Sequence, residues 1–371
     1  MDYKKKICIV FLGNIHYDSR ATNFYNSFSE RGYKVSVISF DWLTKEFKTE
    51  RGDVSVIKLK KRAISIGFYL KFAFILSLRL LFEKADYILA EDVYTLPFAV
   101  LFSKIKRTKV LYDSREIYGH LAGLKKKKNI QAFWRLVEEK CIDKVDIVMT
   151  TGELDSEYIE KEYNLEGTIV IRNLPFPVEI KEAFDFRNHF NLDKSKKILL
   201  YQGVILHGRG LKEIFDIFSE LKNCVLIILG GGEQKEYYQE LAREKNIAKD
   251  VFFFGKVNQN ELFKYTSGAD IGLAIIENLS FSYYLALPNK MFEYIYCGVP
   301  VFVSNFPQMK SIVDKYNVGV YIDPDNKPEI ISRLNNLLDD VELRNKLKEN
   351  CSIAARELNW SEEIKKLFNL L

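Results

Sequence analysis

Short apolar runs alternate with helix-like segments along the whole chain, and this alternation limits the possible folds more than any other feature. A first set of strand-like runs is Ile7–Leu12, Val35–Phe40, Val54–Leu59, Tyr87–Ala90, Lys109–Tyr112 and Ile147–Thr150. A second set is Ile198–Tyr201, Val225–Leu229, Val251–Phe254, Ile271–Ala274, Val299–Val303 and Gly319–Ile322. Strands that alternate with helices favour parallel sheets with helices on both faces. The sequence therefore predicts an α/β protein with two doubly wound halves, whose ligands bind at the carboxyl ends of the strands.

The stretch between the two sets indicates a domain boundary. It contains Pro175 and Pro177, followed by a polar segment rich in Lys, Asp, Asn and Arg. The last segment, Pro328–Leu371, is helical in pattern. We expect an N-terminal Rossmann-like domain at 1–175, a linker at 176–196, a C-terminal domain at 197–357, and a C-terminal helix at 358–371 that packs back on the first domain.

Composition narrows the class of protein. The formal net charge of +5 over 371 residues is too small to indicate a nucleic-acid partner. Five scattered cysteines form no CxxC pair, which is typical of reduced thiols in a cytosolic protein. Four histidines show no ligand spacing, so no metal is expected. The apolar run after Lys4–Lys6 is too short for an export signal, so we expect a cytoplasmic protein.

One segment could contact a membrane. Ile64–Phe82 is rich in Phe and Leu but is interrupted by Lys71 and Arg79, so a spanning helix is not expected. With the basic segment Lys58–Arg62 before it, an amphipathic helix could lie peripherally on an anionic inner-membrane surface. The alternative is a helix packed against its own sheet.

The stretch Leu287–Asn305 carries the most chemistry. It predicts a helix that starts at a proline and ends at Gly298, followed by a buried strand Val299–Ser304. Lys290 and Glu293 are three residues apart and lie on one helical face. A carboxylate for a ribose diol beside a cation for phosphate is suited to a nucleotide sugar. The alternative is an ordinary amphipathic helix with a surface salt bridge.

Three glycine-containing loops follow strands at the expected ligand edge. Leu12–Arg20 contains Gly13, Gln202–Gly210 contains three glycines and Arg209, and Gly230–Glu233 begins with three glycines. Glycines with an arginine before a helix suit a diphosphate, although the second loop matches neither a Walker A loop nor GxGxxG. Each loop could also be a simple turn.

A polar cluster, Asp113–Glu116, follows the strand Lys109–Tyr112 in the first half. Catalytic or acceptor-binding groups are expected at such a strand end. A helix cap with Ser114 as the capping residue is the competing interpretation.

With these residues identified, the chain resembles the family-4 retaining glycosyltransferases of the GT-B fold. The resemblance covers nearly the whole length, and its strongest segments are YQGVILHGRGL, VFFFGKV, ADIGLAI and LPNKMFEYIYCGVPVFVSN. It implies two Rossmann-like domains facing a central cleft. It also implies transfer of a sugar from a UDP- or GDP-sugar to a hydroxyl of a glycan or lipid-linked acceptor, with retention, without metal, in cell-surface polysaccharide biosynthesis.

The resemblance assigns roles to individual residues. Glu293 would bind the ribose hydroxyls, and Arg209 and Lys290 the diphosphate. Catalytic residues would be Arg209, Lys290 and Arg115, and donor-binding residues Gly13, Gly203, Gly208, Gly230, Gly231, Asn289 and Glu293.

The chain also departs from the family pattern. Leu285 replaces a glutamate that normally contacts the donor sugar, Val204 replaces an arginine, and Arg115 replaces a histidine, with His120 nearby. Two alternatives therefore stay open: a non-catalytic subunit that binds a sugar nucleotide, and a sugar-nucleotide 2-epimerase of related architecture.

Overall fold

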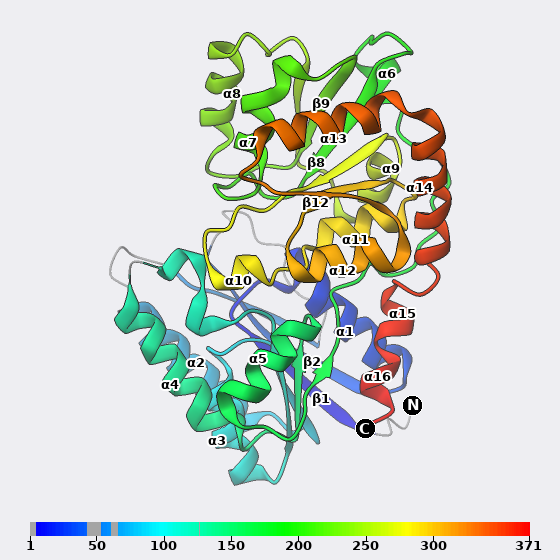
Figure 1. Ribbon diagram of the computed structural model, residues 1–371. Coiled ribbons are helices and arrows are strands. Elements are labelled where there is room, and N and C mark those ends of the chain that lie inside the picture. The colour runs from blue at the N-terminus through cyan, green and yellow to red at the C-terminus, as the bar shows by residue number, and fades with distance from the viewer. Residues whose placement is uncertain (1–4, 43–52, 61–65, 126) are drawn as a thin grey trace. The chain divides into compact units, whose positions relative to one another are not determined.

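The computed structural model describes residues 5–42, 53–60, 66–125 and 127–371 (Figure 1). Residues 61–65, which include parts of the expected basic and amphipathic segments, lie outside these ranges, and so does Lys126. The chain divides into two compact units. Unit 1 comprises Met1–Arg172 and Lys366–Leu371, and unit 2 comprises Asn173–Lys365. Each unit is described by itself.

Unit 1 is built on a seven-stranded parallel sheet in the order β3-β2-β1-β4-β5-β6-β7. Its strands are β1 (Lys6–Phe11), β2 (Lys34–Asp41), β3 (Val54–Lys58), β4 (Tyr87–Ala90), β5 (Lys109–Ser114), β6 (Ile147–Thr150) and β7 (Ile169–Val170). All the strands expected from the apolar runs are present, and the two-residue β7 at the edge is additional. Because β2 and β4 lie on opposite sides of β1, the strand order reverses there, and the carboxyl ends of β1 and β4 flank the position where such sheets bind ligands.

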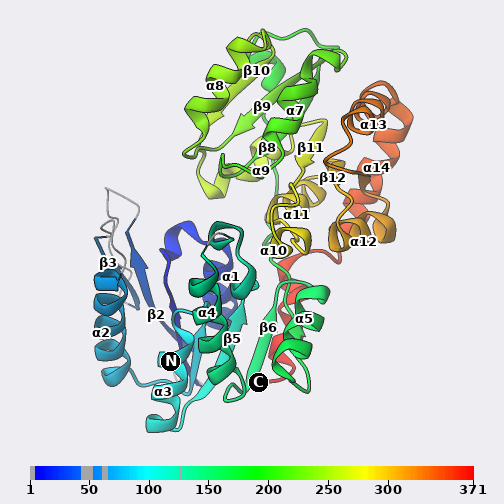
Figure 2. The ribbon, with the colours of Figure 1, turned by 60° about the vertical axis from the view of Figure 1, so that its left-hand side comes forward.

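The helices of unit 1 cover both faces of this sheet (Figure 2). They are α1 (Ser19–Glu30), α2 (Ile66–Phe82), α3 (Leu96–Lys106), α4 (Lys128–Ile142) and α5 (Glu153–Tyr163), with short 3-10 turns at Ile15–Tyr17, Tyr118–His120 and Ala122–Leu124. One side of α2 packs into the core, where the ring of Phe72 lies 4.7 Å from that of Phe40, centroid to centroid.

The last six residues complete unit 1. The Phe368 ring lies 5.2 Å from the Phe28 ring and 4.6 Å from the Arg31 guanidinium carbon. Residues 358–365, which we expected to pack on the first domain, belong instead to unit 2. There Trp360 is fully buried, and its backbone N–H donates to the carbonyl of Pro175 at 2.9 Å.

Unit 2 holds a six-stranded parallel sheet in the order β10-β9-β8-β11-β12-β13. Its strands are β8 (Lys197–Gln202), β9 (Cys224–Leu229), β10 (Val251–Gly255), β11 (Ile271–Ala274), β12 (Val301–Ser304) and β13 (Gly319–Ile322). Its helices are α6 (Phe186–His189), α7 (Leu211–Ile217), α8 (Lys235–Glu244), α9 (Leu262–Thr266), α10 (Phe281–Tyr284), α11 (Asn289–Tyr296), α12 (Pro307–Tyr316), α13 (Lys327–Asp339), α14 (Val341–Ala354) and α15 (Trp360–Glu363). A last helix, α16 (Lys365–Phe368), begins at Lys365, the last residue of unit 2, and continues into unit 1. The strand order reverses at β8.

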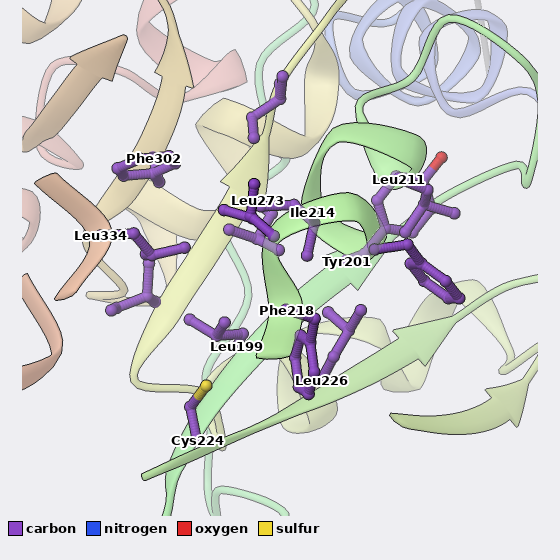
Figure 3. Packing of buried hydrophobic residues seen from close by; sticks show 14 of the residues in the cluster. Leu199, Tyr201, Leu211, Ile214, Phe218, Cys224, Leu226, Leu273, Phe302 and Leu334 are labelled. Atoms are coloured by element: carbon purple, nitrogen blue, oxygen red, sulfur yellow. The ribbon is translucent and has the colours of Figure 1, made fainter. Parts of the chain in front are cut away.

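Successive side chains of the unit 2 strands point to opposite faces, as the pleat requires. Leu199 and Leu226 enter one core cluster with α7, α8 and α13 (Figure 3). Ile198 and Leu200 enter the other, with α11 and α12. The sheet is therefore buried on both faces, which is why its strands are continuous apolar runs in the sequence.

The expected linker at 176–196 lies entirely within unit 2. The Phe184 ring lies 4.7 Å from that of Tyr265, and the Phe190 ring lies 4.3 Å from that of Phe252. Aromatic side chains inside a polar stretch bury enough apolar surface to hold the segment on the domain. The linker interpretation, which followed from the polar composition of this stretch, was therefore wrong.

Candidate functional site

In unit 2, helix α11 is fixed against the sheet by Tyr294. The Tyr294 hydroxyl donates to the carbonyl of Leu200 at 3.0 Å and accepts from the N–H of Gln202 at 2.9 Å. Its ring occupies the space that a Cβ on Gly272 would need. These contacts set the register of α11 against β8 and β11, the two strands at the point where the strand order reverses. Both Lys290 and Glu293 belong to this helix.

Glu293 is oriented by a relay of polar side chains. The Gln202 amide N–H donates to Glu293 Oε2, and the Thr266 hydroxyl fixes that amide by donating to Gln202 Oε1 at 2.8 Å. Burial raises the pKa of Glu293, while the Gln202 hydrogen bond and Lys290 oppose the rise. One carboxylate oxygen is thus held in place, and Oε1 has no hydrogen-bond partner among the described residues. Such an oxygen suits a ribose diol.

Lys290 is buried, with 9% of its surface exposed, and its Nζ lies 4.1 Å from the centroid of the Tyr201 ring. Burial and, to a lesser extent, the charge of Arg209 lower the pKa of this ammonium to about 7, while Glu293 acts in the opposite direction. Within the described chain Lys290 forms no ion pair with Glu293, so the alternative of a surface salt bridge is not what the structure has. A buried cation without a counter-ion is costly, and a bound anion would remove that cost.

Arg209 supplies the second cation. It lies in the loop between β8 and α7, half-buried, with its guanidinium carbon 5.1 Å from the centroid of the Tyr283 ring. Its charge acts on Lys290. In the part of the chain that the structure covers, neither Arg209 nor Lys290 is paired with a carboxylate. Two neighbouring cations without counter-ions are the arrangement expected for a diphosphate.

Glycines bring the loops of this edge close together. Gly230 has a φ of +148°, and a Cβ there would overlap the carbonyl oxygen of Gly203, so the loops after β9 and β8 touch through their backbones. Gly208 packs against Leu279, and a Cβ added to Gly208 would lie 2.5 Å from that side chain. Gly231 packs against Lys256, and a Cβ added there would lie 2.9 Å from the lysine side chain. Asn289 is exposed at the first turn of α11. The structure therefore brings the expected unit 2 residues to one sheet edge.

The corresponding edge of unit 1 is also charged, but its charges are paired. Arg115 donates to Asp18 at 2.6 and 3.1 Å, to Asp113 at 3.4 Å and to Glu91. Arg20 forms a bidentate pair with Asp113, with both distances 2.6 Å. Burial raises the pKa of Glu91 to about 8, and Arg115 only partly offsets this. Burial also acts to raise the pKa of Asp18, but the Arg115 guanidinium outweighs it and holds that pKa low.

The other residues singled out from the sequence occupy varied positions. Gly13 packs on the ring of Phe11, and a Cβ added to Gly13 would lie 2.7 Å from that ring. The close contact that Gly13 permits is therefore one within unit 1. His120 contacts the Tyr158 hydroxyl at 3.0 Å. Leu285 is buried, and Val204 is exposed.

Sequence reasoning missed Gln202, Thr266 and Tyr201 in unit 2, and Asp18 and Glu91 in unit 1. Gln202 and Glu91 are polar residues at the ends of strand-like runs, the same pattern that marks Asp113 in the sequence. Thr266 and Tyr201 carry no such signal, because only the folded chain brings them to Gln202 and Lys290.

Comparison with known proteins first defines the class. Residues 182–352 match the family described as glycosyl transferases group 1. This segment lies within unit 2 and contains Gln202, Arg209, Lys290 and Glu293. The two cations and the oriented carboxylate thus lie in the segment that is similar to the glycosyl transferases group 1 family. The match supports the resemblance to family-4 glycosyltransferases.

Individual proteins extend the similarity. An uncharacterized glycosyltransferase of Methanocaldococcus jannaschii is 23% identical over 194 residues. The matched segment covers 51% of this chain and 48% of the length of that relative. A chitobiosyldiphosphodolichol beta-mannosyltransferase of Debaryomyces hansenii is 22% identical over 418 residues, covering 98% of this chain and 88% of the relative.

Solved structures show the fold. Sucrose-phosphate synthase from Thermosynechococcus elongatus has a TM-score of 0.78 at 15% identity, covering 99% of this chain and 98% of that one. An Anabaena protein solved in complex with UDP and glucose has a TM-score of 0.72 at 13% identity, with 99% of each chain covered. The expected α/β fold with two Rossmann-like domains of the GT-B type is thereby confirmed.

Proposed function

We propose that the protein is a glycosyltransferase that moves a sugar from a nucleoside-diphosphate sugar to a hydroxyl of a glycan or lipid-linked acceptor. The observation that carries this proposal is the pair of cations, Lys290 and Arg209, beside the oriented carboxylate of Glu293 within the segment that is similar to the glycosyl transferases group 1 family. The donor base is proposed to lie against Gly230 and Gly231, the ribose on Glu293, and the diphosphate between Arg209 and Lys290. UDP is the first nucleotide to test, since the Anabaena structure contains it.

The two cations would act most strongly on the leaving group. As the bond between the anomeric carbon and the diphosphate oxygen breaks, negative charge builds on the diphosphate, where fixed positive groups stabilise it. These side chains supply the charge that a divalent metal supplies in other enzymes, so we propose a metal-independent reaction.

Retention of configuration is proposed from the family resemblance. The acceptor oxygen would bond to the anomeric carbon on the face that the diphosphate leaves. Its proton would pass to the departing phosphate oxygen. In this scheme no protein carboxylate is needed as the base.

In unit 1, Arg115 is proposed to act chiefly by positioning Asp18 and Glu91. Four of its five N–H groups already donate to carboxylates, and one on Nη1, which has no partner among the described residues, is proposed to donate to a sugar hydroxyl. Gly13 is proposed to approach the donor through its backbone.

The acceptor is proposed to be a glycan or a lipid-linked sugar of cell-surface polysaccharide biosynthesis. Support comes from the D. hansenii relative, which is named for a diphosphodolichol-linked substrate. The cytoplasmic location expected from the sequence remains part of this proposal.

Calorimetric titration with UDP and GDP tests the donor site. Glu293→Gln and Lys290→Met should each weaken binding of the preferred nucleotide by about tenfold or more, because each removes a buried polar contact. Lys264→Met, an exposed lysine on α9, is the matched control and should bind normally. Unchanged affinity in both site variants would refute the assignment.

A non-catalytic subunit is the second candidate, favoured by Leu285 and by the paired state of Arg115. A chain that binds UDP but never releases it from a UDP-sugar, with any acceptor, would be this subunit. Formation of an epimeric sugar nucleotide without transfer would instead identify a 2-epimerase.

A further inference from the structure

Helix α2 is apolar on two opposite sides. Phe68, Phe72, Leu76 and Leu80 form one stripe, buried in the core of unit 1. Ile66, Leu70 and Phe74 begin a second stripe on the outside, with 71%, 66% and 69% of their surfaces exposed. A surface helix normally has one apolar stripe, and a helix that is apolar all round is normally buried. The outer stripe of α2 therefore requires a partner.

Two neighbouring helices extend this surface. Helix α3 contacts both α2 and α4, and the three helices lie in the same part of unit 1 (Figure 1). More than half of the large apolar side chains exposed in the described chain belong to them. We call this surface the α2–α4 face; its apolar members are Ile66, Leu70, Phe74, Leu78, Leu81, Phe82, Leu101, Ile105, Ile130, Phe133 and Leu136.

The charges on this face are mainly positive. Neither Ile66–Phe82 nor Leu96–Lys106 contains an acidic residue, whereas these two helices carry the exposed residues Lys71, Arg79 and Lys104. Lysines also flank α4, although that helix carries an exposed glutamate. Apolar side chains among lysines and arginines are the composition of helices that lie at the surface of anionic membranes.

Two alternative explanations of the exposed apolar stripe, a dimer and a membrane-spanning helix, fit less well. A second copy of this chain, related by a two-fold axis, would bring two positive faces together. A spanning arrangement does not suit α2, whose 17 residues extend about 25 Å. Every helix in the described ranges is too short or too polar to cross a bilayer. The helix would therefore lie in the plane of the membrane surface.

The α2–α4 face reaches the edge of the sheet that carries the polar network of unit 1. Tyr94, just after β4, lies 5.9 Å from Tyr69 of α2 and 4.6 Å from Trp134 of α4, between ring centroids. Glu91 directly follows the same strand, and Arg115 follows the adjacent β5. A bilayer on the α2–α4 face would thus lie near the end of unit 1 where an acceptor is proposed to bind.

We propose that unit 1 docks on an anionic lipid bilayer through the α2–α4 face, so that the acceptor hydroxyl is presented on a membrane-embedded lipid carrier. The docking follows from the exposed apolar and basic side chains alone. The choice of a lipid-carried acceptor deepens, and rests on, the proposed function.

Vesicle flotation of the full chain tests the docking. The protein should float with vesicles of phosphatidylcholine and phosphatidylglycerol, and bind at least tenfold less to phosphatidylcholine alone. The double variant Leu70→Ser, Phe74→Ser should lose about tenfold or more of the binding, because it removes inserted apolar side chains. Val341→Ser with Ile353→Ser, two exposed apolar residues of α14 in unit 2, is the matched control and should float as the parent does.

A charge variant separates the electrostatic part. Lys71→Glu with Arg79→Glu should weaken binding to the anionic vesicles severalfold, and added salt should weaken binding of the parent in the same way. Since these side chains are exposed, the variants should keep the fold, which circular dichroism checks.

Three outcomes would overturn the docking: no flotation with anionic vesicles, equal flotation of the Leu70→Ser, Phe74→Ser variant, or a dimer of the parent that this variant abolishes. UDP titration of the same samples keeps the two proposals apart. Normal UDP binding without flotation refutes the docking only, whereas flotation without nucleotide binding leaves the docking intact and refutes the donor site. If the docked enzyme transfers sugar to water-soluble acceptors as well as to lipid-linked ones, the lipid-carrier part is wrong.

Discussion

The two units have similar sheets but opposite electrostatics at the edge where the strands end. In unit 1, Arg20 and Arg115 are neutralised by carboxylates that follow β4, lie in β5 and precede α1. In unit 2, Lys290 and Arg209 have no such partners among the described residues, and burial depresses the pKa of Lys290. One topology thus gives a self-neutralised edge in one unit and, among the described residues, an edge with unpaired cations in the other. The difference lies in a few side chains at the strand ends, which supports the placement of the donor in unit 2.

The largest effect is expected from breaking a neutralised pair in unit 1. Arg20→Met leaves Asp113 buried with one cation fewer, and should lower the free energy of unfolding by about 3–5 kcal/mol. Urea unfolding followed by tryptophan fluorescence measures this, since Trp42 and Trp134 lie in unit 1. Arg243→Met breaks an exposed pair on α8 and should cost less than about 1 kcal/mol. If the two variants were equally stable, the buried network would not hold unit 1 together.

An intermediate effect is expected from removing an unpaired cation in unit 2. Arg209→Ala should lower turnover by about a hundredfold, because the leaving diphosphate loses a fixed positive group. Release of UDP from a UDP-sugar measures the rate, with Arg243→Ala as the control. Since Arg209 forms no ion pair with a described residue, the melting temperature should hardly change. A near-normal rate would show that Arg209 does not face the leaving group.

The smallest effect is a pH dependence of donor binding, which Lys290 of unit 2 should cause. The free protein has a Lys290 pKa of about 7, below the ordinary value for lysine, and a bound diphosphate favours the ammonium and raises that pKa. Above pH 7, donor binding must therefore take up a proton, and affinity should fall by up to about tenfold per pH unit. Calorimetry in buffers of different ionisation enthalpy measures the uptake. In Lys290→Met the uptake should disappear, and if it persisted another group would be responsible.

The same contrast shows what could be predicted from sequence. Strands buried on both faces are continuous apolar runs, so Tyr87–Ala90 and Ile271–Ala274 have the bounds that the sequence predicted. The strand Ile169–Val170 was missed because two half-buried residues at a sheet edge give no such signal. The linker prediction at 176–196 was wrong because polar composition outweighed Phe184, Phe186 and Phe190.

Of the candidate site, the sequence could indicate residues that share one helix or one loop. Lys290 and Glu293 are three residues apart, so their common face follows from helical spacing. Their surroundings do not, since Gln202 reaches Glu293 across 91 positions and Arg115 reaches Asp18 across 97. Whether a cation is free or paired depends on such distant contacts. The sequence therefore indicated cations in both units but not the pairing that distinguishes them.

The return of residues 366–371 to unit 1 has a consequence for the order of synthesis. A ribosome makes most of unit 1 first, then all of unit 2, and only afterwards the residues that place Phe368 between Phe28 and Arg31. During synthesis of unit 2 the Phe28 ring lacks this cover, so unit 1 is made before unit 2 but is completed after it. A released chain truncated before Lys366 should therefore fold unit 2 but leave unit 1 without the Phe368 contacts.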